Sequence, residues 1–158
     1  MSSRGRGEGI KVIAQNRRAS HEYHLLDRFE AGLVLTGTEI KSIRAHRVSL
    51  QKAYVQPRDG ELWLMEANIA EYVHGSHENH EPERPRKLLL HRREINQIIE
   101  ALQTKGVTMV PTRLYLKDGR AKVEVALARG KKLYDKRADM AERESKRQIE
   151  RALKERYR

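Results

Sequence analysis

The sequence contains no cysteine, which excludes a disulfide framework and a thiolate zinc site. It has no apolar run of about 18 residues, the length that a transmembrane helix needs. Residues 1–9 are rich in Arg, Gly and Ser and lack an apolar stretch, so they do not have the pattern of a secretory signal. Together these absences predict a cytoplasmic protein.

Acidic residues are fewer than basic residues. The chain carries 33 Lys and Arg against 22 Asp and Glu, a formal net charge of +11 over 158 residues. A field of one sign favours polyanionic partners and speeds their capture. No basic amphipathic helix with a Trp, Phe and Leu face is present, which disfavours a membrane surface. Nucleic acid is therefore the leading partner class; a basic protein whose charge serves only solubility is the alternative.

The first third of the chain combines a basic arm, two strands and a short helix. Residues 1–9 read as a disordered arm and 11–14 as a strand. Residues 16–19 bring Arg17 and Arg18 to an expected turn, which either meets an RNA phosphate or is a solvated loop. A long strand is expected over 21–35, with a bulge or bend at Gly32.

A short helix is expected over 39–46, with Thr38 as its N-cap. Ile40 and Ile43 lie three positions apart and so share one face of this helix. Lys41 and Arg44, also three apart, share another face and are expected to point outward. The helix would be pinned to the body and would display cations to RNA.

Two hairpins are predicted from Asp-Gly dipeptides between apolar runs. The first joins strands over 48–56 and 62–69 and carries Trp63, which we interpret as a core or strand-face residue rather than a base-stacking platform. The second joins strands over 107–116 and 121–128. Between the hairpins, Ile95, Ile98, Ile99 and Leu102 fall at helical spacing, and Gly106 is the expected C-cap.

Three strands, a helix and two strands in this order predict an OB-type antiparallel β-barrel, mainly β with short helices, in which the helix closes one end. We expect three segments: a basic arm over 1–9, the barrel over 10–129 and a basic C-terminal tail over 130–158. Many OB barrels bind oligonucleotides on an outer face, but fold alone does not establish function. A general OB-fold protein that binds single-stranded nucleic acid or ribosomal RNA stays as an alternative.

The C-terminal segment has little to bury. Residues 129–158 contain twelve Lys and Arg against six Asp and Glu, a net charge of +6. A solitary helix of about 20 residues is marginally stable in water. We therefore expect a tail that is disordered when free and helical against an anionic surface, with RNA as that surface. A helix docked on the barrel is the alternative.

Catalytic and cofactor motifs are absent. The sequence has no Walker A loop, dinucleotide fingerprint, nucleophile elbow or His-Glu-x-x-His, so we expect no enzyme and no cofactor. His74, His77 and His80 are regularly spaced, but they lie in a polar loop with no helix to orient them, so a metal site is not expected. A metal-dependent nuclease built on this loop stays as an alternative.

Four stretches, in order and over essentially the whole chain, resemble one family. They are Asn16-Arg17-Arg18-Ala19 with His21 and Tyr23, 29–32 running into 37–44, 86–90, and 130–132 continuing to 135–137. The chain resembles the bacterial tmRNA-binding proteins called small protein B, or SsrA-binding proteins. Its main departures are conservative, such as Ile at 40 and 43 and Arg at 129.

The resemblance implies an OB-type barrel that binds the tRNA-like domain of tmRNA. Elongation factor Tu would deliver the complex to a stalled ribosome, where the tail would probe the decoding centre and the empty mRNA channel. This role is not that of an enzyme, and because nothing in the apolar pattern calls for a dimer, a monomer is expected. By position in the motifs and by the basic pairs described above, the residues expected at tmRNA are Asn16, Arg17, Arg18, Tyr23, Glu30, Lys41, Arg44, Leu89, Lys122, Arg129 and Lys131. Those expected at the ribosome are Lys132, Tyr134, Asp135, Lys136, Arg137, Arg143, Lys146 and Arg147.

Physical chemistry is compatible with these roles. Lys122, Arg129 and Lys131 can pair with phosphates, and Asn16 and Tyr23 can bind or stack on unpaired bases. Glu30 repels phosphate, so it must accept from base or 2′-hydroxyl donors or hold a neighbouring cation. Leu89 packs against a base or fills the barrel, and core is the commoner fate of such a residue.

Overall fold

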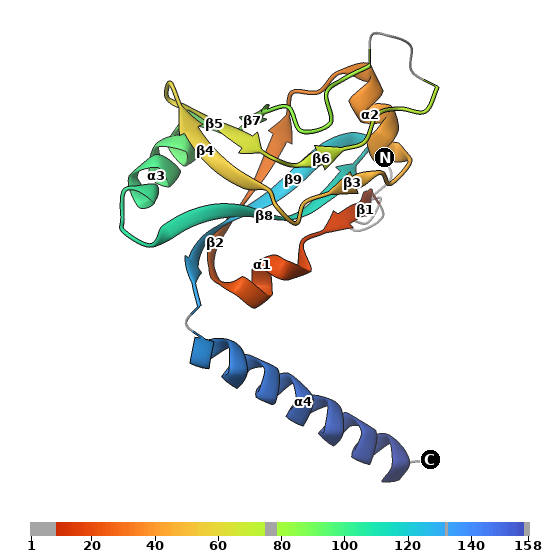
Figure 1. The fold of residues 1–158 in the computed structure, drawn as a ribbon, viewed down its shortest axis with the longest axis vertical. Helices are drawn as coiled ribbons and strands as arrows, with labels where there is room; N and C mark the ends of the chain where they lie inside the picture. Colours follow the sequence, from red (N-terminus) through yellow and green to blue (C-terminus); the bar gives the residue numbers. More distant parts are fainter. Residues whose placement is uncertain (1–8, 75–78, 132, 157–158) are drawn as a thin grey trace, which may run out of the picture.

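A seven-stranded antiparallel sheet forms the body of the protein (Figure 1). The structure is a computed structural model, and it describes residues 9–74, 79–131 and 133–156. The strand order in the sheet is β1-β8-β9-β2-β7-β5-β4. The bounds are β1 (Ile10–Gln15), β2 (Tyr23–Leu33), β4 (Tyr54–Arg58), β5 (Glu61–Met65), β7 (Arg86–Leu89), β8 (Val107–Lys117) and β9 (Arg120–Gly130).

The sheet curls, so that β4 lies against β8 although the two strands do not pair. No strand pairing closes the ring within the described part of the chain, and the fold is an open OB-like barrel with helices. Helix α3 (Arg92–Leu102) contacts β8 and β9, and its Ile95 and Ile98 are buried. The prediction of an OB-type β fold with a helix after the first strands is confirmed.

Both Asp-Gly hairpins are confirmed. In the turn between β4 and β5, Asp59 and Gly60 have φ values of 52° and 74°, and in the turn between β8 and β9, Asp118 and Gly119 have values of 50° and 80°. Two successive positive φ values match the right-handed twist of the flanking strands. The register Lys117↔Arg120 shows that the second loop has only two residues.

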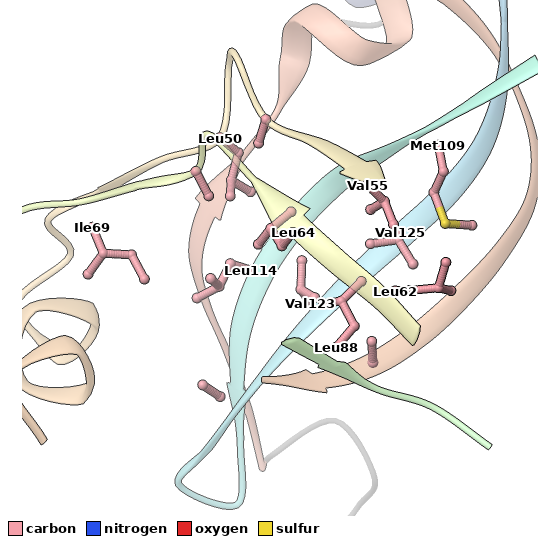
Figure 2. Close-up of a cluster of buried hydrophobic side chains, with 14 of the residues drawn as sticks. Leu50, Val55, Leu62, Leu64, Ile69, Leu88, Met109, Leu114, Val123 and Val125 are labelled. Atoms are coloured by element: carbon pink, nitrogen blue, oxygen red, sulfur yellow. The ribbon is translucent and has the colours of Figure 1, made fainter. Parts of the chain in front are cut away.

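The core lies inside the curl, where β5, β7, β8 and β9 face one another (Figure 2). Along β9, Val123 and Val125 are fully buried, while Lys122 before them and Glu124 between them are partly exposed. This is the alternation of a strand that has one face in the core. The side chains that Figure 2 labels are Leu50, Val55, Leu62, Leu64, Ile69, Leu88, Met109, Leu114, Val123 and Val125.

Several local predictions were wrong. The expected turn at 16–19 is the start of helix α1 (Arg17–Glu22), because Asn16 accepts a hydrogen bond from the backbone N–H of Ala19 and caps it. The N-cap of helix α2 (Gly37–Arg44) is Thr36 rather than Thr38, since Thr36 and Glu39 form a reciprocal capping box. The long strand therefore spans Tyr23–Leu33 rather than 21–35.

The strand count also needs correction. The expected strand over 48–56 divides into β3 (Val48–Ser49) and β4, and the one over 62–69 divides into β5 and β6 (Asn68–Ile69); β3 and β6 pair in a separate two-stranded sheet. Strand β7, which was not predicted as a strand, pairs between β2 and β5 in the middle of the main sheet. The C-cap of helix α3 is Gln103 rather than Gly106.

Helix α4 (Leu133–Arg156) leaves the body after β9 and points away from the sheet (Figure 1). Met140, Ile149 and Leu153 on it are about half exposed. Nine residues separate Met140 from Ile149, so at about 100° per residue they lie on opposite sides of the helix. The helix thus lacks a continuous apolar stripe with which to dock on the barrel. None of the described helices is long and apolar enough to cross a membrane.

Candidate RNA-binding surface

Three of the residues expected at RNA meet on the outer face of the sheet around Gly32. In the strand register, Gly32 of β2 is opposite Lys122 of β9 on one side and Leu89 of β7 on the other. Together with Glu30, these residues line a cleft of about 540 Å³ that continues to the start of α3. Strand pairing therefore gathers residues that lie up to 92 positions apart in the sequence.

Gly32 keeps this cleft open. A Cβ atom at this position would lie 3.3 Å from Cβ of Leu89 and 3.7 Å from Nζ of Lys122. Leu89 has 52 % of its surface exposed, so it does not fill the barrel. The core role considered for Leu89 is therefore wrong, because the strand alternation places its neighbour Leu88 inside instead.

The Glu30 carboxylate is held by two donors on β8. The hydroxyl of Tyr115 donates to Oε2 at 2.5 Å, and Nζ of Lys117 donates to Oε1 at 3.3 Å. The hydrogen bond from Tyr115, aided by Lys117 and by the charge of Lys122, holds the pKa of Glu30 below its ordinary value despite partial desolvation. The pKa of Tyr115 is raised, first by burial and then by this bond. Glu30 is thus ionised and oriented at neutral pH.

Sequence reasoning missed Tyr115 and Lys87. Tyr115 was included in an apolar strand, although its place opposite Lys122 puts it on the outer face. Lys87 lies on β7 two positions before Leu89 and lines the same cleft. Correct assignment of β7 as a strand would have found Lys87, because residues two apart in a strand share a face.

A second group of expected residues lies at the other end of β2. Tyr23 and Gly32 are nine positions apart, which in a strand amounts to about 30 Å. Tyr23 and Arg18 line a separate cleft of about 430 Å³ with Asn16 and Tyr54. The structure does not bring this group together with Glu30, Lys122 and Leu89.

Within this second group, Asn16 has a structural duty. Its side chain is buried, donates to the carbonyl of Pro111 at 2.9 Å and accepts from the backbone of Ala19. Arg17 and Arg18 are exposed on α1, and Arg17 lines a third, shallower pocket beside Arg28. Direct contact of Asn16 with a base stays a prediction, and its amide already serves to fix α1 on β8.

Arg129 and Lys131 follow at the end of β9. Arg129 is exposed and pairs in register with His24. The side chain of Lys131 is only 6 % exposed. Its Nζ donates to the carbonyl of Ser20 at 3.0 Å and forms an ion pair with Asp139 of α4. In this structure Lys131 therefore joins α1 to the tail.

Lys41 and Arg44 are exposed on α2, as expected, and Nζ of Lys41 lies 5.4 Å from the centre of the Tyr72 ring. The helix is fixed by Glu39, which is fully buried and accepts from Nε of Arg86 at 2.6 Å and from Arg84. Burial alone would raise the pKa of Glu39, but the bonds from Arg84, the Thr36 backbone and Arg86 outweigh it and lower that pKa.

His80 is part of the same buried network. Its Nε2 lies 2.7 Å from the carbonyl of Ile69 and its Nδ1 lies 2.9 Å from the hydroxyl of Thr38. A carbonyl can only accept, so Nε2 carries the proton and neither nitrogen is left for a metal. His74 packs edge-on against Tyr72, and His77 lies outside the described residues. The described residues contain no group of three metal-ligating side chains.

The tail residues differ in how far they are described. Nζ of Lys136 donates to Oε2 of Glu22 at 2.6 Å, and Lys146 pairs at 3.6 Å with Glu142, one helical turn earlier on α4. Arg137, Arg143 and Arg147 are exposed. Lys132 lies outside the described residues, as do the side chains of Tyr134 and Asp135.

Comparison with known proteins tests the family resemblance found in the sequence. The family model described as SmpB protein matches residues 13–155. The chain belongs to the SmpB family. An SsrA-binding protein of Thermobifida fusca (strain YX) is 58 % identical over 96 % of this chain and 94 % of its own. One of Roseiflexus castenholzii (strain DSM 13941 / HLO8) is 59 % identical over 97 % and 98 %.

A solved structure supports the same assignment. A chain from the structure named "tmRNA-SmpB: a journey to the center of the bacterial ribosome" superposes with a TM-score of 0.65 at 45 % identity. The match covers 76 % of this chain and 85 % of that chain. The SmpB family resemblance inferred from four short stretches is confirmed, and the fold agrees with it.

Proposed function

We propose that this protein is the RNA-binding adaptor of trans-translation: it binds the tRNA-like domain of tmRNA and brings it to stalled ribosomes. The observation that carries the proposal is the cleft around Gly32, where Glu30, Lys122 and Leu89 converge in a chain of the SmpB family. Its role is binding and not catalysis, and it acts in the cytoplasm as a monomer.

The cleft combines three kinds of RNA contact. Lys122 pairs with a phosphate, which supplies affinity but little sequence information. The exposed side chain of Leu89 offers an apolar surface to a base or ribose. The Glu30 carboxylate is oriented by Tyr115 and accepts from donors on a base edge or a 2′-hydroxyl, which distinguishes a folded RNA from a generic polyanion.

The tail serves the ribosome. Helix α4 displays Arg137, Arg143 and Arg147 to solvent and lacks a continuous apolar face. Ribosomal RNA around an empty mRNA channel would supply the anionic surface that such a helix needs, whereas bound mRNA would exclude it sterically. We propose that the tail reads the decoding centre in this way, and that elongation factor Tu accompanies the complex on delivery.

Binding of the full-length protein to three RNAs tests the first half of the proposal. The RNAs are the tRNA-like domain of tmRNA, an ordinary tRNA and a scrambled RNA, each at two salt concentrations. We expect much tighter binding to the tmRNA fragment that persists at the higher salt. Equal binding to all three, lost together as salt rises, would reduce the protein to a general polyanion binder.

Removal of residues 138–158 tests the second half. We expect the shortened protein to bind the tmRNA fragment as the full chain does but to lose rescue of stalled ribosomes. The opposite result, lost tmRNA binding with intact ribosomal activity per bound complex, would refute this division of labour between body and tail.

A further inference from the structure

The outer face of the sheet continues beyond the Gly32 cleft onto β5 and β4. Lys87 of β7 is opposite Trp63 of β5, and Trp63 is opposite Gln56 of β4. Their inward neighbours Arg86 and Leu64 are buried, so Lys87 and Trp63 lie on the outside, as Leu89 does. The β4–β5 hairpin lies beside β7 (Figure 1).

Trp63 presents its ring and not its nitrogen. The indole Nε1 is buried and has no hydrogen-bond partner, so it cannot bind a ligand at the surface. The guanidinium of Arg58, whose side chain is exposed at the end of β4, lies 6.0 Å from the centre of the Trp63 ring. This geometry is that of a cation held over an aromatic face. Trp63 and Arg58 together offer RNA an aromatic surface with a positive charge beside it.

Charge along this face favours an anion. Three carboxylates border the cleft, and each has a partner: Glu30 binds Tyr115 and Lys117, Glu61 forms an ion pair with Arg92 at 2.6 Å, and Glu94 accepts from the backbone N–H of His91. Lys87 takes part in no ion pair among the described residues, although it lines the cleft. Glu30 and Glu61 are therefore paired with cations of their own and Glu94 with a backbone N–H, while Lys87 and Arg58 stay available to phosphate.

We infer that the RNA-binding surface extends from the Gly32 cleft through Lys87 onto Trp63 and Arg58, and that one RNA spans the whole of it. This inference rests on the proposed function and names further contact residues for the same RNA. The run from β9 to β4 crosses four gaps between strands of about 4.8 Å each, or about 19 Å. A folded RNA is broad enough to cover it, with Lys87 and Arg58 at phosphates and Trp63 against a base or ribose.

Binding of full-length variants to the tRNA-like domain of tmRNA tests the inference. Trp63→Leu keeps apolar bulk but removes the aromatic face, and we expect about a five- to tenfold loss of affinity. Lys87→Gln should weaken binding and reduce the slope of log affinity against log salt by about one. Arg58→Gln should weaken binding in the wild-type background and have a smaller effect beside Trp63→Leu, because the ring positions the guanidinium.

Controls separate this inference from the proposed function. Lys105→Gln removes an exposed charge between α3 and β8, outside this face, and should leave affinity unchanged. Lys122→Gln should weaken binding if the Gly32 cleft is the RNA site. Wild-type affinity in the Trp63, Lys87 and Arg58 variants, with reduced affinity in Lys122→Gln, would overturn the extension alone. If wild type shows no preference for tmRNA, the proposed function fails and the extension with it.

Folding is a separate check. The Arg58→Gln and Lys87→Gln variants change side chains outside the core, so their melting temperatures should match wild type and their affinities can be read directly. If Trp63→Leu alone melts early, these two variants still decide the outcome. In chemical footprinting, nucleotides that Lys87→Gln exposes should adjoin those that Lys122→Gln exposes; separate locations on the RNA would refute one continuous surface.

Discussion

Tyr115 donates a 2.5 Å hydrogen bond to Oε2 of Glu30, a residue 85 positions earlier in the chain. The two residues are on the outer face of β8 and β2, with β9 between them. Tyr115 is buried to 3 % exposure, so its ring is fixed and its hydroxyl sets the direction of the carboxylate. Glu30, the acid expected at RNA, is therefore preorganised by a residue that the motifs do not contain.

Removing this hydroxyl should alter Glu30. In Tyr115→Phe we expect the pKa of Glu30 to rise towards its ordinary value of 4.5, because the largest contribution that lowers it is gone. Affinity for the tmRNA fragment should fall by about three- to tenfold, the range of one hydrogen bond to a charged group after allowance for the partial exposure of Glu30. Carboxyl titration by NMR and RNA binding measure the two effects.

The pH dependence of stability shows whether Tyr115 acts on the Glu30 carboxylate or only packs in the fold. A lowered folded-state pKa contributes stability above the unfolded value near 4.5, and that contribution disappears as the pH falls through the folded pKa. Wild type and Tyr115→Phe should therefore differ in unfolding free energy at pH 7 and converge in acid. A constant difference across that range would contradict the role of Tyr115 on Glu30. Thr112→Val on the same strand is a matched control.

The buried pair of Glu39 and Arg86 should dominate the stability of α2. Arg86→Met leaves a buried carboxylate with fewer donors, and we expect a loss of about 3 kcal/mol in unfolding free energy. Arg92→Met removes the exposed pair with Glu61 and should cost less than about 1 kcal/mol. Urea denaturation of both variants measures the contrast, and equal losses would refute it.

A side chain at Gly32 should disturb the cleft. In Gly32→Ala the new Cβ would press on Leu89 at 3.3 Å, so the edge of the cleft must shift. We expect weaker binding to the tmRNA fragment with a loss of stability of about 1 kcal/mol. Gly37→Ala is the control, since a Cβ there meets no atom within 4 Å. If both variants bind alike, the close approach at Gly32 is not used by RNA.

Helix α4 should be held to the body only at its start. Lys131 pairs with Asp139 and Lys136 pairs with Glu22, whereas no described residue of α4 beyond Asp139 forms a hydrogen bond or ion pair with the body. In the free protein we expect little protection from hydrogen exchange over 140–156. In Asp139→Asn, which loses the ion pair with Lys131, protection of the first turns of α4 should also fall. Strong protection along the whole helix would contradict a tail that folds on binding.

The ion pair of Lys136 with Glu22 gives this prediction a second readout. Glu22 has a lowered pKa, chiefly because Lys136 donates to it. In Lys136→Gln the pKa of Glu22 should return towards its ordinary value, while the pKa of Glu30 at the far end of β2 stays as it is. An unchanged Glu22 titration would show that the contact does not persist in solution.

Local sequence signals determined much of the fold. Asp59-Gly60 and Asp118-Gly119 fixed two hairpins, because few other dipeptides adopt two successive positive φ values. The spacing of Ile95 and Ile98 located α3, since a face three to four residues apart is buried in a helix. Excess basic charge and four short motifs were enough to predict the RNA-binding family.

Tertiary structure decided what lies together. Helix α1 was missed because six residues are too few to show a periodicity, and its stability comes from the bonds of Asn16 to Ala19 and Pro111. Strand β7 was missed because its four residues are recognisable as a strand only once β2 and β5 pair with them. The orientation of Glu30 by Tyr115, the outward place of Leu89 and the alignment of Lys87 with Trp63 depend on strand register. Sequence alone determined which residue types this protein has for RNA, whereas pairing between distant strands determined which of them form one surface, because register is set by packing across the whole sheet.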